Sequence, residues 1–224
     1  MKFSNRTASL STIGSGIFGF LAIGSLVGYL VLRNINESEG IFISKFHDAA
    51  AVFQFLLMIP VAFVFYKLSA TSKTLFNFGI AAISFTALCL LLGFPKITTD
   101  VFYMFPQGVF GVWLVIVCWR MKQIMHPALR WFGIIVGLGL ALVGTFVIGF
   151  AIFVNADAVR IPAPPMKYYP LTPANLFLHQ ILYTGSFMGV FTLPVWTILI
   201  GRWLFKKPHQ YILNFKVKKN HQFR

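Results

Sequence analysis

The sequence predicts an all-α, polytopic membrane protein: a bundle of six transmembrane helices with the N- and C-termini in the cytoplasm. Of its 224 residues, 58% are hydrophobic and only 11% are charged, whereas a soluble domain carries about 25% charged residues. Its apolar runs are long enough to cross a bilayer, which takes roughly 20 helical residues. They lack the period-two alternation of barrel strands, so helices are expected.

The six predicted helices cover residues 10–32, 46–66, 75–94, 101–119, 131–154 and 176–205. The first is too long for the apolar core of a signal peptide, and no small-residue cleavage pattern follows it, so a retained helix is expected. Pro60 and Pro194 lie within the second and sixth, where the missing N–H predicts a kink. Residues 1–205 form the transmembrane domain and residues 206–224 form a basic, aromatic cytoplasmic tail.

The basic residues indicate the orientation, because cytoplasmic loops of membrane proteins carry an excess of Lys and Arg. With both termini inside, the N-terminus and inner loops hold seven of these residues and the C-terminal end another seven, 14 of the 19 in the chain. They are Lys2, Arg6, Lys67, Lys73, Arg120, Lys122, Arg130, Arg202, Lys206, Lys207, Lys216, Lys218, Lys219 and Arg224. All five acids fall on the outer side. The predicted location is the cell inner (plasma) membrane, with multiple passes.

The net charge of +14 predicts a lipid partner rather than nucleic acid, because the position of the charges matters more than their sum. The tail interleaves basic and aromatic residues next to the last helix. Such a segment is attracted to anionic lipids of the inner leaflet, and its aromatic rings enter the interface. Docking to a partner protein is the alternative interpretation of the tail.

Glycines spaced four apart predict helix-packing positions, because small residues let membrane helices approach closely. The first, fifth and sixth helices each contain one such pair: Gly24 and Gly28, Gly133 and Gly137, Gly185 and Gly189. Packing within the chain and homodimerisation are the two interpretations of this spacing.

Polar residues near the outer ends of three helices predict a ligand pocket that opens to the outer side. His47 and Gln54 are seven residues apart and therefore share one face of the second helix. In the sixth helix, one stripe carries His179, Tyr183 and Ser186. Gln107, near the start of the fourth helix, is a further candidate.

Two of these candidates also have structural interpretations. Asp48 stands beside His47 at the start of the predicted second helix, where an acid caps free N–H groups and complements the helix dipole. His179 lies one turn inside its helix, where a hydrogen-bonded packing role competes with ligand binding. Asp48 therefore joins the candidate ligand-binding residues with capping as its alternative.

No catalytic or metal-binding motif accompanies these residues. Ser186, His179 and Asp48 are the right residue types for a hydrolase, but no nucleophile motif positions them. Haem ligation through His47 and His179 is the one cofactor option, since two helices each supply an imidazole; no cofactor and no metal is otherwise expected. Cys89 and Cys118 fall near opposite ends of their helices, too far apart for a disulfide.

Helices four and five carry a recognisable stretch, PQGVFGVWLVIVCWRMKQIMHPALRWFGIIVGLGLALVG, at residues 106–144. It combines G-x-F-G-x-W-L, a short basic loop and P-x-L-R-W-x-G-x-x-x-G. Residues 193–207, LPVWTILIGRWLFKK, are similar in style. These stretches resemble the bacterial six-helix membrane family catalogued as domain of unknown function 4386. The resemblance implies the six-helix topology and no catalytic site.

The function expected first is that of a non-enzymatic integral membrane protein, an accessory or scaffold subunit of a membrane assembly. The alternative is a binder or transporter of a small apolar or amphipathic molecule through the predicted pocket. A membrane haem or redox protein is the third. The candidate partners are the bilayer, a protein partner and a second copy of the chain.

Overall fold

The computed structural model describes residues 4–32, 37–69, 72–93, 95, 97–99, 101–162 and 172–206, and within these ranges it is helical without strands. The elements are α1 (Asn5–Leu32), α2 (Glu37–Leu56), α3 (Ile59–Ser69), α4 (Lys73–Gly93), α5 (Met104–Arg120), α6 (Pro127–Phe153), η1 (Ala156–Val159), α7 (Pro173–Gly185), η2 (Ser186–Val190) and α8 (Leu193–Lys206). Five helical segments are long and apolar enough to cross a membrane, and the shorter α5 is apolar as well. The predicted all-α class is confirmed.

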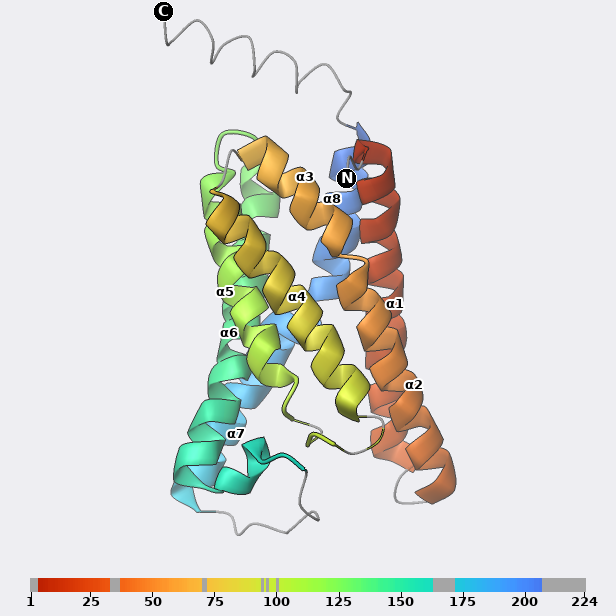
Figure 1. Cartoon of the computed structure of the whole chain (residues 1–224), viewed down its shortest axis with the longest axis vertical. Coiled ribbons are helices and arrows are strands. Elements are labelled where there is room, and N and C mark those ends of the chain that lie inside the picture. The colour runs from red at the N-terminus through yellow and green to blue at the C-terminus, as the bar shows by residue number, and fades with distance from the viewer. Residues whose placement is uncertain are drawn as a thin grey trace, which may run out of the picture.

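The helices form a ring in which neighbours in sequence are neighbours in space (Figure 1). α1 packs against α2, α4 packs against α2 and α5, and α6 packs against α5 and α7. α8 then returns to α1 and closes the ring. α1 begins and α8 ends at the same end of the bundle. Most of the connections are short, which favours antiparallel neighbours; the longest, residues 154–172, joins α6 to α7.

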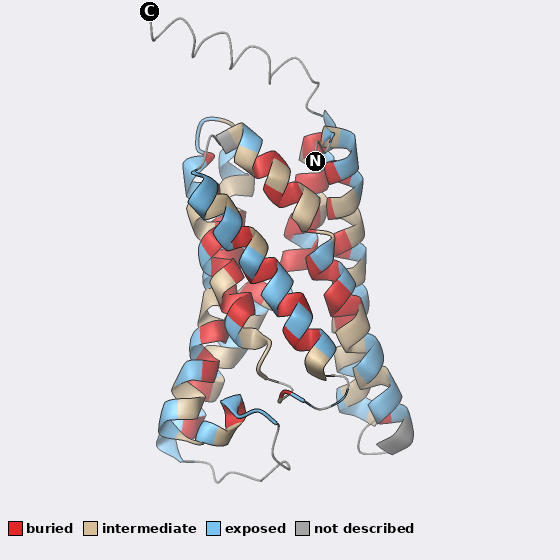
Figure 2. Ribbon diagram, in the orientation of Figure 1, coloured by how far each residue is buried: buried red, intermediate tan, exposed pale blue. Residues whose placement is uncertain are grey.

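Buried residues line the interior of the ring, and exposed residues line its outside (Figure 2). The largest buried side chains include Trp113, Trp196, Phe55, Phe65 and Phe110. Many residues on the outside are also large and apolar, for example Phe187 with 73% exposure. An apolar exterior is what a hydrocarbon environment favours.

Most helix boundaries differ from the predicted ones by a few residues, and the start of α2 differs most. α2 begins at Glu37 rather than at residue 46, so the helix continues well beyond the apolar run. The predicted second and sixth helices are also interrupted, the second at residues 57–58 and the sixth between α7 and α8. The boundaries differ because hydropathy marks only the apolar part of a helix. The helix itself continues as long as its backbone hydrogen-bond pattern continues.

Glycines bring α5 and α6 into backbone contact. A Cβ built on Gly108 would lie 2.5 Å from the Gly144 Cα, and a Cβ built on Gly111 would lie 2.5 Å from the Gly137 carbonyl oxygen. Neither distance is compatible with any larger side chain. These two glycine pairs form the α5–α6 seam, which explains why two long helices run so close together.

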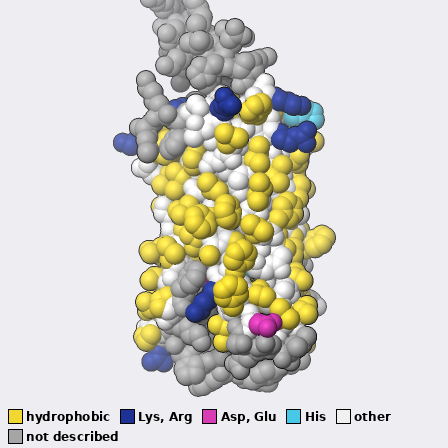
Figure 3. Space-filling model, turned by 90° about the vertical axis from the view of Figure 1, so that its right-hand side faces the viewer, with side chains coloured by type: hydrophobic (Ala, Val, Ile, Leu, Met, Phe, Trp, Pro, Cys, Tyr) yellow, Lys and Arg dark blue, Asp and Glu magenta, His cyan; other side chains and the backbone are white. Residues whose placement is uncertain are grey.

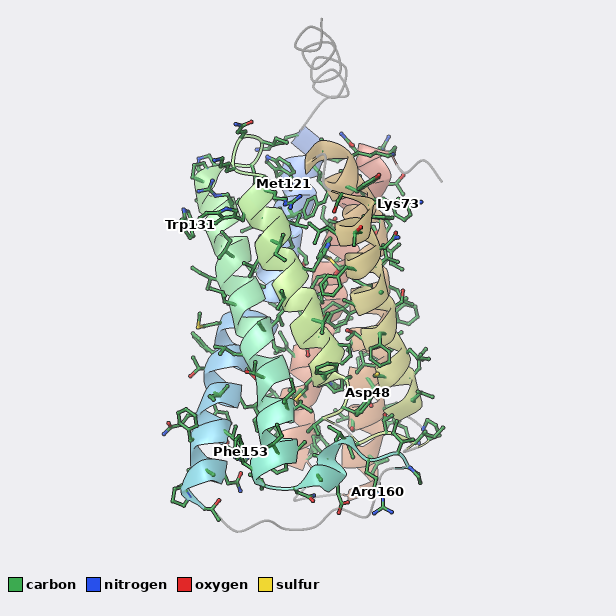
Figure 4. All side chains as sticks on the ribbon, turned by 60° about the vertical axis from the view of Figure 1, so that its left-hand side comes forward. Asp48, Lys73, Met121, Trp131, Phe153 and Arg160 are labelled. Carbon is green, nitrogen blue, oxygen red and sulfur yellow. The ribbon has the colours of Figure 1, made fainter. Side chains whose placement is uncertain are left out.

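The two ends of the bundle carry different charges. In the view of Figure 3, most of the visible Lys and Arg lie at the upper end, an apolar belt covers the middle, and the lower end shows an acid together with further basic side chains. We name the upper end the basic end; its described residues are Arg6, Lys67, Lys73, Arg120, Lys122, Arg130, Arg202 and Lys206. Figure 4 places Lys73 and Trp131 toward this end, and Asp48 and Arg160 toward the other.

Candidate functional site

Serines on α1 bridge this helix to its two neighbours. Ser11 donates its hydroxyl hydrogen to the Leu57 carbonyl oxygen at 2.8 Å, and Ser15 donates to the Gln54 carbonyl oxygen at 2.8 Å. On the other side of α1, Ser9 donates to the Gly201 carbonyl oxygen of α8 at 2.7 Å. The serines of α1 therefore connect it by hydrogen bonds to two helices that are each interrupted, α2–α3 on one side and α7–α8 on the other.

The first interruption separates α2 from α3 and explains two of these bonds. Met58 donates its N–H to Phe55 at 2.9 Å, one residue short of the α-helical partner, so the Gln54 carbonyl is released. Pro60 has no N–H to continue the pattern. Released carbonyls inside a membrane need another donor, and the serines of α1 supply it.

The second interruption lies between α7 and α8. Residues 186–190 form one π-helical turn, in which Phe191 donates its N–H to Ser186 at 3.0 Å, and Pro194 follows in α8. Thr192 donates to the Met188 carbonyl, and Thr197 donates to the Pro194 carbonyl at 2.8 Å. Because of this bend, α7 packs on α6, whereas α8 packs on α1.

Both interruptions meet at the middle of α1. A Cβ built on Gly19 would lie 2.6 Å from Cγ of Pro194 and 2.7 Å from Nε2 of Gln54. One turn earlier, a Cβ on Gly16 would lie 2.7 Å from the Pro194 carbonyl oxygen. We name this region the break centre; it comprises Ser15, Gly16, Gly19, Gln54, Pro194 and Thr197.

The break centre is polar but uncharged. Gln54 is 7% exposed, and the hydrogen bond described above uses its main-chain carbonyl, not its carboxamide. A carboxamide both donates and accepts hydrogen bonds. The centre therefore presents a carboxamide as its polar side-chain group, and none of its six residues is an acid or a base. In many transporters, interrupted helices line the binding site.

His47 contacts the same helix as Gln54. Its Nδ1 donates to the Ala22 carbonyl oxygen of α1 at 2.8 Å, and its Nε2 lies 4.0 Å from an Asp48 carboxylate oxygen. The capping interpretation of Asp48 is wrong, because α2 begins at Glu37 and Asp48 lies well inside it. The predicted helix start at residue 46 is wrong because the residues before Phe46 are less apolar but still helical.

His179 lies in a different helix pair. Its Nδ1 donates to the Asn175 carbonyl oxygen of its own helix at 2.8 Å, and its ring packs against Phe146 and Phe150 of α6. The ring of Tyr183 is 6.2 Å from that of His179, but Tyr183 is 67% exposed on the outside of the bundle. The structure does not bring the His179 stripe together with His47 and Gln54.

The two remaining pocket candidates lie at other positions. Gln107 is 5% exposed in the first turn of α5. Ser186 begins the π-helical turn, and its carbonyl closes that turn by accepting from Phe191. The sequence contains part of the signal for the break centre. Pro60 and Pro194 predict kinks, and Ser11 and Ser15, one turn apart, lie on one face of the first helix.

The six predicted packing glycines divide into two groups. Gly133, Gly137, Gly185 and Gly189 lie against backbone or core side chains; a Cβ on Gly133, for example, would lie 2.6 Å from Sγ of Cys118. A Cβ built on Gly28 would make only an ordinary van der Waals contact, 3.7 Å from the Ile43 side chain. A Cβ built on Gly24 would have no atom of another element within 4 Å.

The remaining predictions concern the two cysteines, metal binding and the C-terminal tail. Cys89 and Cys118 are both free and buried. Within the described ranges, no group of three or more His, Cys, Asp or Glu side chains gathers to hold a metal ion. Residues 207–224 of the predicted tail lie outside the described residues, so their binding to anionic lipids or to a partner stays a prediction.

The chain matches no family model, no curated protein and no solved structure. Its resemblance to the six-helix bacterial family therefore stays a prediction.

Proposed function

We propose that this chain is a non-enzymatic accessory or scaffold subunit of an assembly in the cell inner membrane. In this proposal it crosses the membrane six times, with both termini in the cytoplasm. The observation that supports the scaffold role is Gly24 of α1, which packs against no other helix of this chain. Gly24 is exposed, and a Cβ built on it would have no atom of another element within 4 Å. Most described glycines of the bundle, in contrast, pack against another helix.

The surroundings of Gly24 favour contact with another helix. Ile17, Leu21 and Val31 lie on the same outward stripe of α1, with 52%, 43% and 58% exposure. Ile17 and Leu21 lie seven and three residues before Gly24, and Val31 lies seven residues after it, so all four share one face of the helix. A small residue in the middle of such a face lets a partner backbone approach closely. The partner is either another subunit or a second copy of this chain.

The test is copurification from native membranes with Gly24→Leu. The larger side chain has free space within this chain, so we expect the variant to insert and fold normally but to lose its partner. Gly93→Leu is the matched control, because Gly93 also has no atom within 4 Å but lies at the end of α4. A wild-type protein that is purely monomeric, without copurifying partners, would contradict the scaffold role.

A second candidate function is favoured by the break centre. Two interrupted helices that meet on one glycine of α1 are suited to bind, or to move, a small apolar or amphipathic molecule with a hydrogen-bonding group. Mass spectrometry of small molecules that copurify with the protein tests this. Gln54→Leu should remove the bound species, whereas His179→Ala, which alters a contact with α6, should retain it. Loss with both variants or with neither would count against the break centre.

Haem ligation stays a third, untested option. His47 and His179 donate through Nδ1 to main-chain carbonyls of α1 and α7, respectively. Their bonds fall in different helix pairs, so a single haem would need a rearrangement of these helices. We therefore rank haem binding below the other two functions.

A further inference from the structure

Two adjacent Trp–Arg pairs flank the turn between α5 and α6. Trp119 and Arg120 end α5, and Arg130 and Trp131 lie in the first turns of α6. The two indole rings meet edge to face with centroids 6.2 Å apart, and the Arg130 guanidinium lies 5.5 Å from the Trp131 centroid. The rings remain 60% and 48% exposed at the basic end of the bundle. Paired exposed tryptophans at this position are typical of the membrane–water interface.

The cations beside these rings have no counter-charge within the described part of the chain. Arg120 and Lys122 are exposed, and the Nε of Arg130 is buried without a hydrogen-bond partner. The two ion pairs described for the protein belong to α2 and η1, at the other end of the bundle. A buried guanidinium nitrogen without a partner is costly. Within the described residues, therefore, no anion neutralises the cations of this corner.

An apolar surface continues from the rings toward the middle of the membrane. Val112 of α5 and Ile135 and Leu138 of α6 are 45%, 43% and 47% exposed. The α5–α6 seam holds these two helices together, so the strip formed by the three side chains has a fixed width and direction. A charged head beside an apolar strip matches the shape of a phospholipid.

We propose that this corner binds one anionic phospholipid. Its phosphate accepts hydrogen bonds from Arg120, Arg130 and Lys122, since guanidinium and ammonium groups are the usual partners of phosphate. Trp119 and Trp131 contact the glycerol region, and one acyl chain lies along the apolar strip. The residues of this site belong to α5, α6 and the turn between them, and the proposal does not depend on the proposed scaffold role.

Native mass spectrometry of the full chain tests the proposal, with equal amounts of phosphatidylglycerol and phosphatidylcholine added to the detergent. We expect the wild type to retain phosphatidylglycerol selectively. Arg120→Gln with Lys122→Gln should weaken this binding by about thirtyfold, as expected from two basic residues at the surface. Both side chains are exposed, so the fold is expected to remain intact.

Two further variants separate a built site from general attraction. Lys45→Gln with Arg160→Gln removes the same charge from the opposite end, where both side chains are exposed, and should leave the selectivity unchanged. Trp119→Leu with Trp131→Leu keeps the net charge and should still lower retention. The proposal is overturned if both charge variants lose binding equally, if the tryptophan variant binds as the wild type does, or if the wild type shows no preference between the lipids.

Discussion

Individual hydroxyl groups make the interrupted helices of this protein compatible with a membrane. Ser11 and Ser15 donate to two carbonyls at the junction of α2 and α3, and Thr197 donates to the Pro194 carbonyl of its own helix, α8. In water a released carbonyl would be hydrated at little cost. In hydrocarbon it would stay unsatisfied at a cost of several kcal/mol. The serines of α1 are therefore part of the fold rather than incidental polar residues.

Ser15→Ala should destabilise the protein because it leaves the Gln54 carbonyl without its donor. We expect a loss of about 0.6–2 kcal/mol, the range for hydrogen bonds between membrane helices. Ser25→Ala is the matched control, since Ser25 donates to Leu21 of its own helix and bridges no other element. Unfolding in mixed detergent and SDS micelles measures both variants. Equal stability of the two would show that the bridge to Gln54 contributes nothing.

The all-helical class was predicted correctly, whereas the number of six spans stays a prediction, because five segments are long enough to cross a membrane and α5 is shorter. Pro60 and Pro194 predicted the two kinks, because a missing N–H is a local property of the residue. The π-helical turn before Pro194 and the early start of α2 were not predicted. The turn depends on how α7 and α8 pack on two different helices, and the early start of α2 depends on backbone hydrogen bonds that hydropathy does not register.

The α5–α6 seam gives a prediction at the level of a helix pair. Gly111→Leu should push α5 away from α6, because its Cβ would already lie 2.5 Å from the Gly137 carbonyl oxygen. We expect a loss of about 1–3 kcal/mol or more, as for overpacked cores. The adjacent Val112→Leu, whose side chain is 45% exposed, should change stability by less than about 0.5 kcal/mol. Thermal unfolding in detergent compares them, and similar transitions would contradict the seam.

At the scale of the whole molecule, the sequence could show which residues share a face of one helix but not which faces meet. His47 and Gln54 do contact a common helix, α1. His179 was expected opposite them, but the bend in the last segment places α7 on α6 and only α8 on α1. The order of helices around the ring therefore decides the candidate site, and this order results from long-range packing between residues far apart in the chain.

The ring also separates charge along its axis, and this gives a prediction about orientation. The basic end should face the cytoplasm, because Lys and Arg are retained there during insertion. A single cysteine introduced at Lys206, at the end of α8, would mark the basic end of the bundle, and one introduced at Arg160, just after η1, would mark the opposite end. Both residues are exposed. The native Cys89 and Cys118 are 2% and 0% exposed and should contribute little background.

We expect a membrane-impermeant maleimide to label Arg160→Cys in intact cells and Lys206→Cys only after permeabilisation. The reason is that the two positions lie at opposite ends of one bundle, with the hydrocarbon layer between them. Labelling confined to Lys206→Cys in intact cells would invert the orientation. Labelling of both variants in intact cells would contradict a membrane-spanning bundle, because no single orientation exposes both ends to the same compartment.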